Sequence, residues 1–480
     1  MSSTPPMTPL TQDYHVPRFL LQKYAKAGPR YTSYPTAPVW HNDFTAADAR
    51  AIYAGNNFSD PGDQVLEQVK PHHNPLAVYV HLPFCQSLCW YCGCNTKIAR
   101  NKKVLLPYLT ALRQEIQRVS PYLAADRQVT QMHWGGGTPT YLSPEQIVAL
   151  VKDLKAAMVF SPDAELSIEV DPRVTHVEHL EALRESGFNR ISMGLQDFNP
   201  DVQEAIHRVQ PYEMTAELIT KSRELGFRSV NVDLIYGLPL QSTESFAETL
   251  AQVKTLDPDR LALFHYAHMP WARPAQKLIK DVDLPSSAEK LNIFEMTIDT
   301  LLADGYRYIG MDHFAKPDDE LSLAQEARTL RRNFMGYTTQ AGVDLYGFGA
   351  SSISEIDGHF IQNHREVPDY ENALAAGDLP TARGLRLTPE DHLRKAVIEA
   401  LICNGYLDFE QMSQGFGVDF EAHFAPALHE AEAMARDGLL TFEGRALRVL
   451  PRGQILIRNI CMLFDAYLSQ AGARTFSQTA

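Results

Sequence analysis

The chain has 480 residues, of which 45% are hydrophobic, and a formal net charge of -14. This length is enough for one large domain with appendages or for two domains, and the acidic balance argues against a general nucleic-acid-binding surface, which needs clustered Lys and Arg. No run of about eighteen apolar residues is present, and residues 1–9 are polar and Pro-rich, unlike a secretory signal. We therefore expect a cytoplasmic protein without a membrane span or nucleic-acid partner. We also expect a monomer, because no coiled-coil heptad compels a dimer.

Residues 1–70 are expected to form an N-terminal arm with short helices. Within it, residues 28–37 (GPRYTSYPTA) are rich in turn formers and aromatics and too irregular for a strand or a helix. This segment is either a linker laid over the rest of the fold or a segment that closes over a ligand. The second hypothesis rests on two tyrosines and Arg30 lying between prolines.

A strand-then-helix unit repeats from residue 76 onward. The predicted strands are 76–82, 131–134, 165–170, 190–195, 229–235 and 260–266, and the helices between them are 105–119, 144–158, 175–186, 215–225 and 245–256. Such alternation predicts parallel strands joined by right-handed crossovers. Six units are too few for an eight-stranded barrel, so we expect an α/β fold built on a partial (β/α)6 TIM-like barrel.

The pattern changes after about residue 285. A helix over 288–302, a strand around 306–311, and the segments 314–327 and 337–353 are expected to extend the sheet. A helix over 391–402 and a strand pair within 440–450 follow. We therefore divide the chain into the arm (1–70), a barrel with further strands (71–374) and a mainly helical C-terminal domain (375–480).

Polar residues follow each predicted barrel strand, where the chemistry of such folds gathers. In strand order they are Cys85; the turn Gly-Gly-Gly-Thr-Pro-Thr at 135–140; Glu169 and Asp171; Gln196 and Asp197; Asp233 with 236–239; and 265–268. One polar cluster at each of six strand ends indicates a single functional site at this edge of the sheet.

Four of the six cysteines lie within residues 85–94. Thiols stay reduced in the cytosol, so a metal-binding or catalytic role is favoured over a disulfide framework. Cys85, Cys89 and Cys92 form C-x3-C-x2-C, which can place thiolates on three corners of a [4Fe-4S] cube. Zinc is the alternative, although structural zinc sites are normally built from two separated pairs. Cys403 and Cys461 stand alone in helical patterns, and we expect them to be ordinary buried residues.

This cysteine loop, with Tyr91 just before its third cysteine, resembles the radical S-adenosylmethionine superfamily, and the 135–140 turn resembles the region that contacts the methionine amine. A more specific pattern covers the chain from about residue 14 to about 470. Its segments together resemble the family of oxygen-independent coproporphyrinogen III oxidases (dehydrogenases) of heme biosynthesis: 29–36, 79–85, 92–95, 133–140, 167–173, 233–239 and 310–315.

The resemblance implies a [4Fe-4S] cluster on Cys85, Cys89 and Cys92 and two molecules of S-adenosylmethionine. It implies a 5'-deoxyadenosyl radical that removes a hydrogen from the β-carbon of a propionate, after which loss of carbon dioxide and an electron leaves a vinyl group. Two propionates of coproporphyrinogen III would be converted, giving protoporphyrinogen IX. An electron donor of flavodoxin or ferredoxin type is implied as a partner.

The resemblance also assigns contacts with the two S-adenosylmethionine molecules. Those to the first are Tyr79, Gly136, Glu169 and Ile353, and those to the second are Tyr91, Gly137, Thr138, Gln196, Arg208, Asp233 and Ala267. Glu169 and Asp233 end apolar strands, where an unpaired charge would cost several kcal/mol, so ligand contact is favoured there. Packing stays the alternative for Tyr79 and Ile353, and an ordinary surface position for Arg208.

Three further expectations concern the substrate and the fourth cysteine. A tetra-anionic substrate needs cations, and the candidates are Arg30, Arg331, Arg332 and Arg386. Cys94 has a role near the second cofactor or the substrate, or is a structural thiol. Met335 stands where a Gln is familiar in the family, which is a departure at one cofactor contact.

Two other functions compete with the enzyme. Heme chaperones in the same broader family typically continue after the third cysteine with one residue and then Phe, and they lack the N-terminal arm. Here Gly93, Cys94 and Asn95 follow Cys92 and the segment 30–36 is present, which favours the enzyme. The other competitor is a cytosolic zinc protein with a barrel scaffold.

Overall fold

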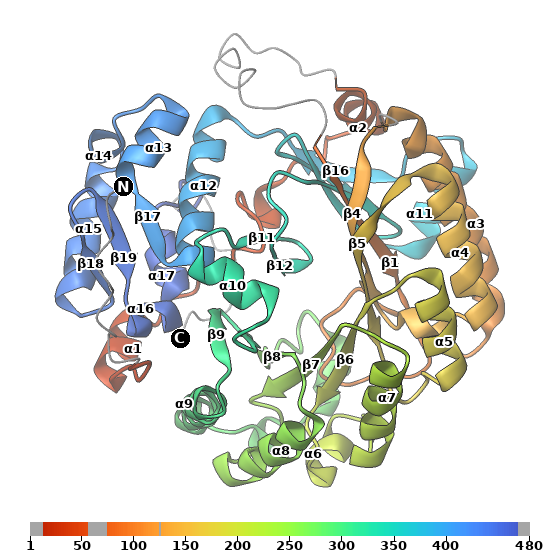
Figure 1. Ribbon diagram of the computed structural model, residues 1–480, viewed down its shortest axis with the longest axis horizontal. Helices are drawn as coiled ribbons and strands as arrows, with labels where there is room; N and C mark the ends of the chain where they lie inside the picture. The colour runs from red at the N-terminus through yellow and green to blue at the C-terminus, as the bar shows by residue number, and fades with distance from the viewer. Residues whose placement is uncertain (1–12, 56–73, 124–125, 469–480) are drawn as a thin grey trace.

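The computed structural model describes residues 13–55, 74–123 and 126–468. The parts of the expected arm over 1–12 and 56–70, and the end of the C-terminal domain over 469–480, lie outside the described residues. Within the described part, a twelve-stranded sheet has the order β16-β15-β14-β13-β1-β4-β5-β6-β7-β8-β10-β9. Its parallel middle curves into an open, partial barrel with helices on the outside (Figure 1).

The parallel part of the sheet contains the six predicted strands in chain order. They are β1 (Leu76–Leu82), β4 (Gln128–Gly136), β5 (Val159–Val170), β6 (Arg190–Gln196), β7 (Ser229–Tyr236) and β8 (Arg260–His265). Six of the seven residues of β1 are buried, as expected of a strand covered on both faces. The partial barrel predicted from the alternation is confirmed.

Six helices of the described residues cover the barrel, and two of them begin at a capping box formed by a serine. They are α3 (Leu105–Val119), α4 (Pro144–Ala157), α5 (Val177–Ser186), α6 (Pro200–Ala205), α7 (Tyr212–Glu224) and α8 (Thr243–Leu256). Ser143 and Gln146 form a capping box at the start of α4, and Ser242 and Ser245 form one at the start of α8. Each box satisfies backbone N–H groups that the helix leaves free.

Further strands extend the sheet at both ends. Next to β1 lie β13 (Asp344–Phe348), which is parallel to it, and then the antiparallel strands β14 (Ile353–Ile356), β15 (His359–Asn363) and β16 (Thr381–Leu385). Next to β8 lie the antiparallel strands β10 (His313–Ala315) and β9 (Arg307–Gly310), reached through α9 (Ser287–Ala303). The extension of the barrel by further strands is confirmed.

The expectation that 314–327 extends the sheet is correct only for β10. A helix, α10 (Glu320–Glu326), occupies half of that segment, because the side chain of Asp319 accepts from Leu321 N and caps the helix. Likewise β12 (Gly336–Thr338) pairs with β11 (Arg331–Asn333) in a separate hairpin and not with the main sheet.

The C-terminal region is mainly helical, as expected. It contains α12 (Pro389–Asn404), α13 (Phe409–Phe416), α14 (Phe420–His423), α15 (Ala425–Arg436), α16 (Pro451–Ile455) and α17 (Ile457–Met462). The predicted strand pair is present as β18 (Leu440–Phe442) and β19 (Ala446–Val449), and β17 (Tyr406–Asp408) adds a third strand. β16 still belongs to the main sheet although it follows residue 374, so we propose a domain division near 386 in place of 374–375. No helix of the described residues is long and apolar enough to cross a membrane.

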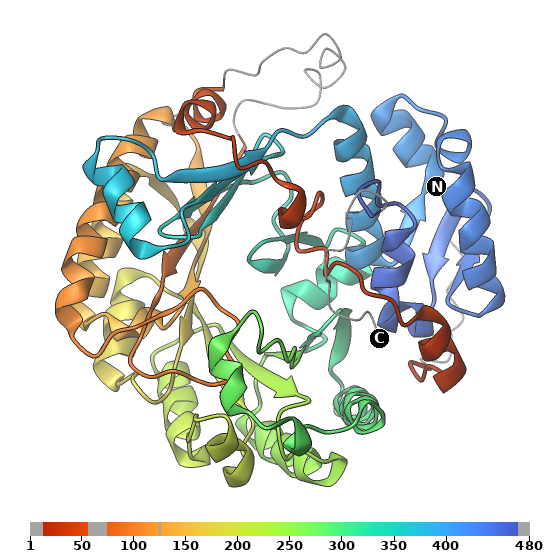
Figure 2. The same cartoon turned by 180° about the vertical axis from the view of Figure 1, so that it is seen from behind.

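The arm joins the two parts of the molecule. Its helix α1 (Arg18–Tyr24) lies beside the C-terminal helices, and the chain then crosses toward α2 (Ala46–Tyr53) at the barrel (Figure 2). Val16, Leu20 and Tyr24 are buried in one apolar cluster with residues of α12 and α17. The crossing residues 28–37 form bends without a strand, as predicted.

Candidate functional site

The cysteine loop begins where β1 ends. Its base is closed by β2 (Phe84–Cys85) and β3 (Lys97–Ile98), which pair in parallel. The backbone N–H of Gly137 donates to Leu82 O and that of Thr138 donates to Phe84 O, each at 2.9 Å. These bonds hold the glycine-rich turn after β4 against the base of the loop. Two of the six predicted strand-end groups therefore lie side by side.

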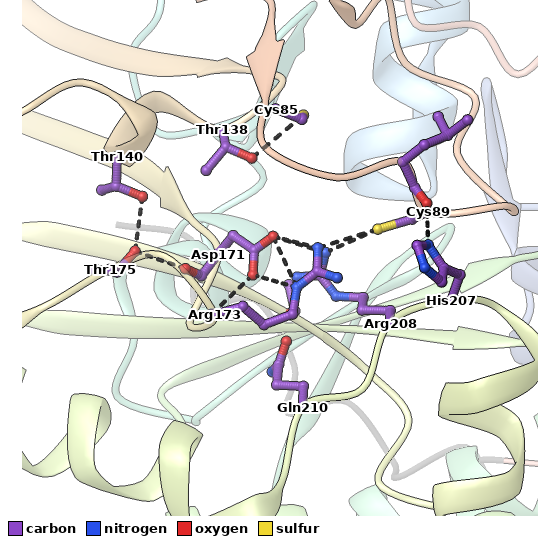
Figure 3. Close-up of polar contacts among 12 residues, drawn as sticks. Cys85, Cys89, Thr138, Thr140, Asp171, Arg173, Thr175, His207, Arg208 and Gln210 are labelled. Carbon is purple, nitrogen blue, oxygen red and sulfur yellow. Dashed lines mark hydrogen bonds and ion pairs between the residues drawn. The ribbon is translucent and has the colours of Figure 1, made fainter. Parts of the chain in front are cut away.

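Two of the three thiols of the motif, Cys85 and Cys89, accept hydrogen bonds from side-chain donors. Thr138 Oγ1 donates to Cys85 Sγ at 3.4 Å, and Arg173 Nη2 and Arg208 Nη1 donate to Cys89 Sγ at 3.3 and 3.5 Å (Figure 3). Among the described residues, no three His, Cys, Asp or Glu side chains converge on a single metal-ion position. Hydroxyl and guanidinium donors stabilise thiolates, and such donors tune iron–sulfur clusters. This donor set fits a cluster that takes one thiolate at each of three irons.

A buried charge network lies beneath Cys89. Asp171 accepts from Arg173 Nη2 at 2.6 Å and from Arg208 Nη1 at 3.2 Å (Figure 3). Burial by itself would raise the pKa of Asp171, but Arg208 and Arg173 outweigh it and lower the pKa. Burial likewise acts to lower the pKa of Arg208, but nearby acidic groups, led by Tyr91 and Asp171, raise it. Both arginines therefore stay charged beside the thiol of Cys89.

Arg208 and Gln196 lie together and each has an unused polar atom. Arg208 Nη2 donates to Gly194 O at 2.7 Å, while the buried Arg208 Nε and Gln196 Oε1 have no hydrogen-bond partner. A Cβ at Gly194 would lie 2.7 Å from Gln196 Nε2 and 3.2 Å from Arg208 Nη2. Only glycine leaves room here for both side chains. Orphaned buried polar atoms indicate a missing ligand, because each costs free energy when left unpaired.

Glu169 lies at the end of β5, and its carboxylate accepts hydrogen bonds from groups on the neighbouring strand β4. Gly136 N donates to its carboxylate at 3.0 Å, and His133 Nε2 lies at 3.5 Å. Burial acts to raise the pKa of Glu169, but His133 and the Gly136 N–H outweigh it and the pKa is lowered. The side chain keeps 44% of its surface exposed. Glu169 is therefore an ionised acceptor that is open to a ligand.

Tyr79 and His81 form a polar chain on β1. His81 Nε2 lies 3.0 Å from Asn95 O, which can only accept, so Nε2 carries the proton and Nδ1 accepts from Tyr79 Oη at 3.0 Å. Burial lowers the pKa of His81. Gly136 has a φ of +114°, and a Cβ there would lie 2.6 Å from the His81 ring. Gly136 is thus required by its conformation and by its close approach to His81.

Asp233, on β7, is the second carboxylate of the site. Asn231 Nδ2 donates to it at 2.7 Å and Ser192 Oγ at 3.3 Å. Burial and the nearby charge of Glu169 raise the pKa of Asp233 to about 7. The two strand-end carboxylates predicted from the sequence therefore share one interior and differ in protonation.

The remaining predicted contacts fall in two places. Gln276 Nε2 donates to Tyr91 O at 2.9 Å and to Ala267 O at 3.2 Å, which joins the cysteine loop to the end of β8. Ile353 begins β14 in the sheet extension and packs against the apolar cluster that contains Trp40 and Phe360. The structure therefore brings Tyr91 and Ala267 together.

The burial predicted for Cys403 and Cys461 is confirmed, whereas no placement was predicted for Cys94. Cys403 and Cys461 are buried, and Cys94 is exposed. A hydrogen bond from Cys94 lowers the pKa of Cys92 to about 6, against the effect of burial. Cys94 therefore supports the third thiolate of the motif.

Of the four arginines predicted to bind carboxylates, two lie together. Arg30 pairs with Asp312, and Arg332 Nη1 donates to Arg30 O at 3.3 Å. Arg331 Nη1 lies 3.6 Å from Glu399 Oε2. Arg386 Nη2 donates to Asp48 Oδ1 of α2 at 2.8 Å. Met335 lies in the turn between β11 and β12, where its backbone N–H donates to Asn333 at 2.8 Å.

Two further cations near Arg30, Arg458 and Lys290, were not predicted, and they lie with His265 of the predicted 265–268 group. Arg458 Nε donates to Pro29 O at 2.9 Å. Lys290 and His265 lie on either side of Gly237, where a side-chain Cβ would be 3.3 Å from Lys290 Cε and 3.5 Å from His265 Cδ2. Burial, then Arg30, lowers the pKa of Arg458 to about 10, and burial, then Lys290, lowers that of His265 to about 4. The sequence gives no local signal for this group, because only the meeting of the arm, the barrel and the C-terminal domain creates it.

Two family models match the chain: the radical SAM superfamily over residues 79–253 and the HemN C-terminal domain over residues 387–456. The oxygen-independent coproporphyrinogen III oxidase of Salmonella typhimurium is 48% identical, over 94% of this chain and 95% of the relative, and that of Escherichia coli K12 is 47% identical over the same shares. The solved structure described as "Coproporphyrinogen III oxidase (HemN) from Escherichia coli is a Radical SAM enzyme" is 45% identical. It superposes with a TM-score of 0.87 over 94% of this chain and 99% of that one.

Proposed function

This chain belongs to the family of oxygen-independent coproporphyrinogen III oxidases, and from that membership we propose that it oxidatively decarboxylates two propionates of coproporphyrinogen III to vinyl groups. The product is protoporphyrinogen IX, in heme biosynthesis. The observation that carries the proposal is the placement of the C-x3-C-x2-C thiols at the carboxyl edge of the parallel strands, beside ionised and orphaned polar groups. The alternative of a heme chaperone is not favoured, because the relatives that match nearly the whole chain are named as oxidases.

The enzyme is an oxidoreductase of the radical SAM superfamily. Cys85, Cys89 and Cys92 would hold a [4Fe-4S] cluster, and two molecules of S-adenosylmethionine would lie beside it. When bound, these groups supply a 5'-deoxyadenosyl radical, and the protein supplies position and the exclusion of water. The guanidinium groups of Arg173 and Arg208 stabilise the thiolate of Cys89.

The two S-adenosylmethionine molecules are assigned to the strand-end residues as follows. Tyr79, Gly136, Glu169 and Ile353 would contact the first, with Glu169 accepting from an ammonium or ribose hydroxyl. The contacts of the second would be Tyr91, Gly137, Thr138, Gln196, Arg208, Asp233 and Ala267. The unpartnered Arg208 Nε and Gln196 Oε1 support this assignment, because a carboxylate and a donor on the ligand would satisfy them.

The substrate carboxylates would be bound by the cations between the barrel and the C-terminal domain. Arg30, Arg332, Arg458 and Lys290 come from the arm, the β11 strand, α17 and α9. Asp312 is the carboxylate paired with Arg30 in this group. A porphyrinogen with four carboxylates would displace that internal pairing, because charge-assisted bonds from arginine are strong and geometrically specific.

The proposal includes the remaining partners. The electron donor would be of flavodoxin or ferredoxin type, and the enzyme would act in the cytoplasm as a monomer. The six free thiols are compatible with a reducing compartment.

Anaerobic turnover tests the proposal. Protein reconstituted with iron and sulfide is incubated with coproporphyrinogen III, S-adenosylmethionine and dithionite, and we expect the divinyl product together with methionine and 5'-deoxyadenosine. Cys89→Ser should lose cluster and product, whereas Cys403→Ala, at a buried cysteine of α12 outside the motif, should keep about the same iron content and serves as the matched cysteine control. Stable transfer of heme without any decarboxylation would instead establish the chaperone.

A further inference from the structure

A groove of about 810 Å3 lies against the outside of the cysteine loop. Its lining includes Leu88 and Trp90 of the loop, Ile98, Arg100 and Lys102 from the segment after it, and Tyr141. None of these residues is among the expected S-adenosylmethionine contacts. The groove is therefore a separate feature from the strand-end site.

The groove is separated from the thiols by a single loop. Leu88 and Trp90 flank Cys89 in the chain, and the Trp90 ring stacks on His207 with centroids 5.4 Å apart. His207 Nδ1 contacts Leu88 O at 2.8 Å, while the next residue, Arg208, reaches Cys89 Sγ (Figure 3). Cys89 itself is only 8% exposed. A molecule in the groove would thus lie one layer of residues from a cluster ligand without entering the site.

The surface around the groove has the opposite charge to the protein as a whole. Residues 85–114 contain five basic and no acidic residues, in a chain of net charge -14. Arg113 pairs with Asp153, while Lys102 lies over the Tyr141 ring at 5.1 Å. Lys97, Arg100, Lys102 and Lys103 are exposed and have no carboxylate within ion-pair distance in the described part of the chain. An acidic partner would be repelled by most of this molecule and attracted here.

Apolar side chains are exposed inside this basic rim. Leu88 and Ile98, which line the groove, are 36% and 37% exposed, and Val104 and Leu106, which follow in the chain but do not line the groove, are 38% and 61% exposed. Exposed apolar side chains in a groove with a polar, charged rim are typical of a protein interface. The feature therefore combines concave shape, apolar lining and a single sign of charge.

We propose that this groove is the docking site of a small acidic one-electron carrier protein of flavodoxin type, an inference that rests on the proposed function. The cations at the rim would bind the acidic surface of the carrier, and the apolar, aromatic lining would receive the exposed edge of its flavin. Cys85, Cys89 and Cys92 would hold the group that accepts one electron from the reduced flavin, and the flavin would be oxidised by that one electron. No bond is made or broken in this transfer.

Binding tests the surface without any need for turnover. Oxidised flavodoxin is titrated calorimetrically into the full chain at low ionic strength. In Lys102→Glu/Lys103→Glu the dissociation constant should rise about tenfold or more, and added salt should weaken the wild-type complex. Lys152→Glu/Arg228→Glu, which changes the net charge equally at exposed positions outside the groove, should bind within about twofold of wild type. Equal binding by both double variants would overturn the proposal.

Reduction kinetics separate docking from chemistry. With reconstituted protein, reduced flavodoxin should reduce the cluster about tenfold more slowly in Lys102→Glu/Lys103→Glu than in wild type, while dithionite reduces both at the same rate. Failure of wild type to form product with dithionite would contradict the proposed function and leave the binding result to decide the docking site. If an acidic ferredoxin competes for the groove and flavodoxin does not bind, the assignment of a flavin carrier is wrong.

Discussion

Glu169 and Asp233 show how the site differentiates two carboxylates on neighbouring parts of one sheet edge. The pKa of Glu169 is lowered by donors from His133 and Gly136, whereas the pKa of Asp233 is raised to about 7 by burial and by the charge of Glu169. Asp233 therefore binds the proton near neutral pH, and Glu169 stays ionised. Glu169 can therefore accept hydrogen bonds from a cationic group, whereas the carboxyl group of Asp233 can donate a hydrogen bond or accept one.

Asp233→Asn should change stability in a pH-dependent way. The pKa of Asp233 is about 7 in the folded protein and 3.8 in the unfolded chain, so the unfolded chain loses this proton at lower pH. Raising the pH from about 4 to about 7 therefore lowers the free energy of unfolding, by up to roughly 4 kcal/mol. The Asn variant avoids this cost, so it should be more stable than wild type at pH 8 and nearly equal at pH 4. Urea unfolding at the two pH values measures the difference. Asp201→Asn, at an exposed position, is the matched control, and an equal effect of Asp233→Asn at both pH values would contradict the account.

Single-residue chemistry was partly predictable from the sequence. The strand-end carboxylates stood out because charges at the ends of apolar strands need partners. The contact of Arg173 and Arg208 with Cys89 could not be predicted, because these residues are 84 and 119 positions away and only the closure of the sheet brings them together.

At the scale of elements, Glu115 joins α3 to the sheet extension. It is buried and accepts from Gly349 N at 2.8 Å after β13, from Asn363 Nδ2 at 2.5 Å on β15, and from Tyr370 Oη at 2.6 Å on α11 (Val367–Ala375). Burial raises the pKa of Glu115 to about 7. This one side chain fixes the added strands to the parallel barrel.

Glu115→Ala should destabilise the protein by about 3–5 kcal/mol, because it leaves the buried Gly349 N–H and Tyr370 hydroxyl without an acceptor and removes one of the three acceptors of Asn363 Nδ2. Glu115→Gln keeps a carbonyl oxygen for part of the network and should cost less than half as much. Denaturant midpoints of the two variants measure this order. Equal midpoints would show that the network contributes little and that packing alone holds the extension.

Element boundaries show where pattern and structure differ. β1 and α3 begin and end where the periodicity predicts. β5 instead begins at Val159, six residues before the predicted start, because Ser161, Pro162 and Asp163 resemble a turn in the sequence. Val159 and Phe160 nevertheless pair with β4, and Ser161, Pro162 and Asp163 lie in a register shift before the pairing resumes at Glu165, so the early start of β5 depends on the neighbouring strand.

At the scale of the whole molecule, the arm connects the barrel to the C-terminal domain. Tyr31 Oη donates to Asp465 at 3.0 Å, and Tyr34 Oη accepts from Ala466 N at 3.1 Å. Arg30 reaches Asp312 next to β10 from the same segment. The sequence suggested a closing segment at this place, but which surfaces it joins depends on the packing of both domains.

Arg30→Ala should weaken substrate binding while leaving the cluster intact. Loss of one charge-assisted contact with a propionate should raise KM for coproporphyrinogen III about tenfold, and iron content should stay unchanged. Arg18→Ala, an exposed position on the same arm, is the matched control. Unchanged KM and turnover in Arg30→Ala would reject the closing role of the arm.

The central claim is that the site removes hydrogen from the propionates of coproporphyrinogen III. The most direct measurement uses substrate deuterated at the propionate β-carbons in the anaerobic reaction, with mass analysis of the 5'-deoxyadenosine formed. The account predicts deuterium in 5'-deoxyadenosine and its loss from the two converted side chains. Formation of 5'-deoxyadenosine without deuterium, with all four propionates retained, would contradict it.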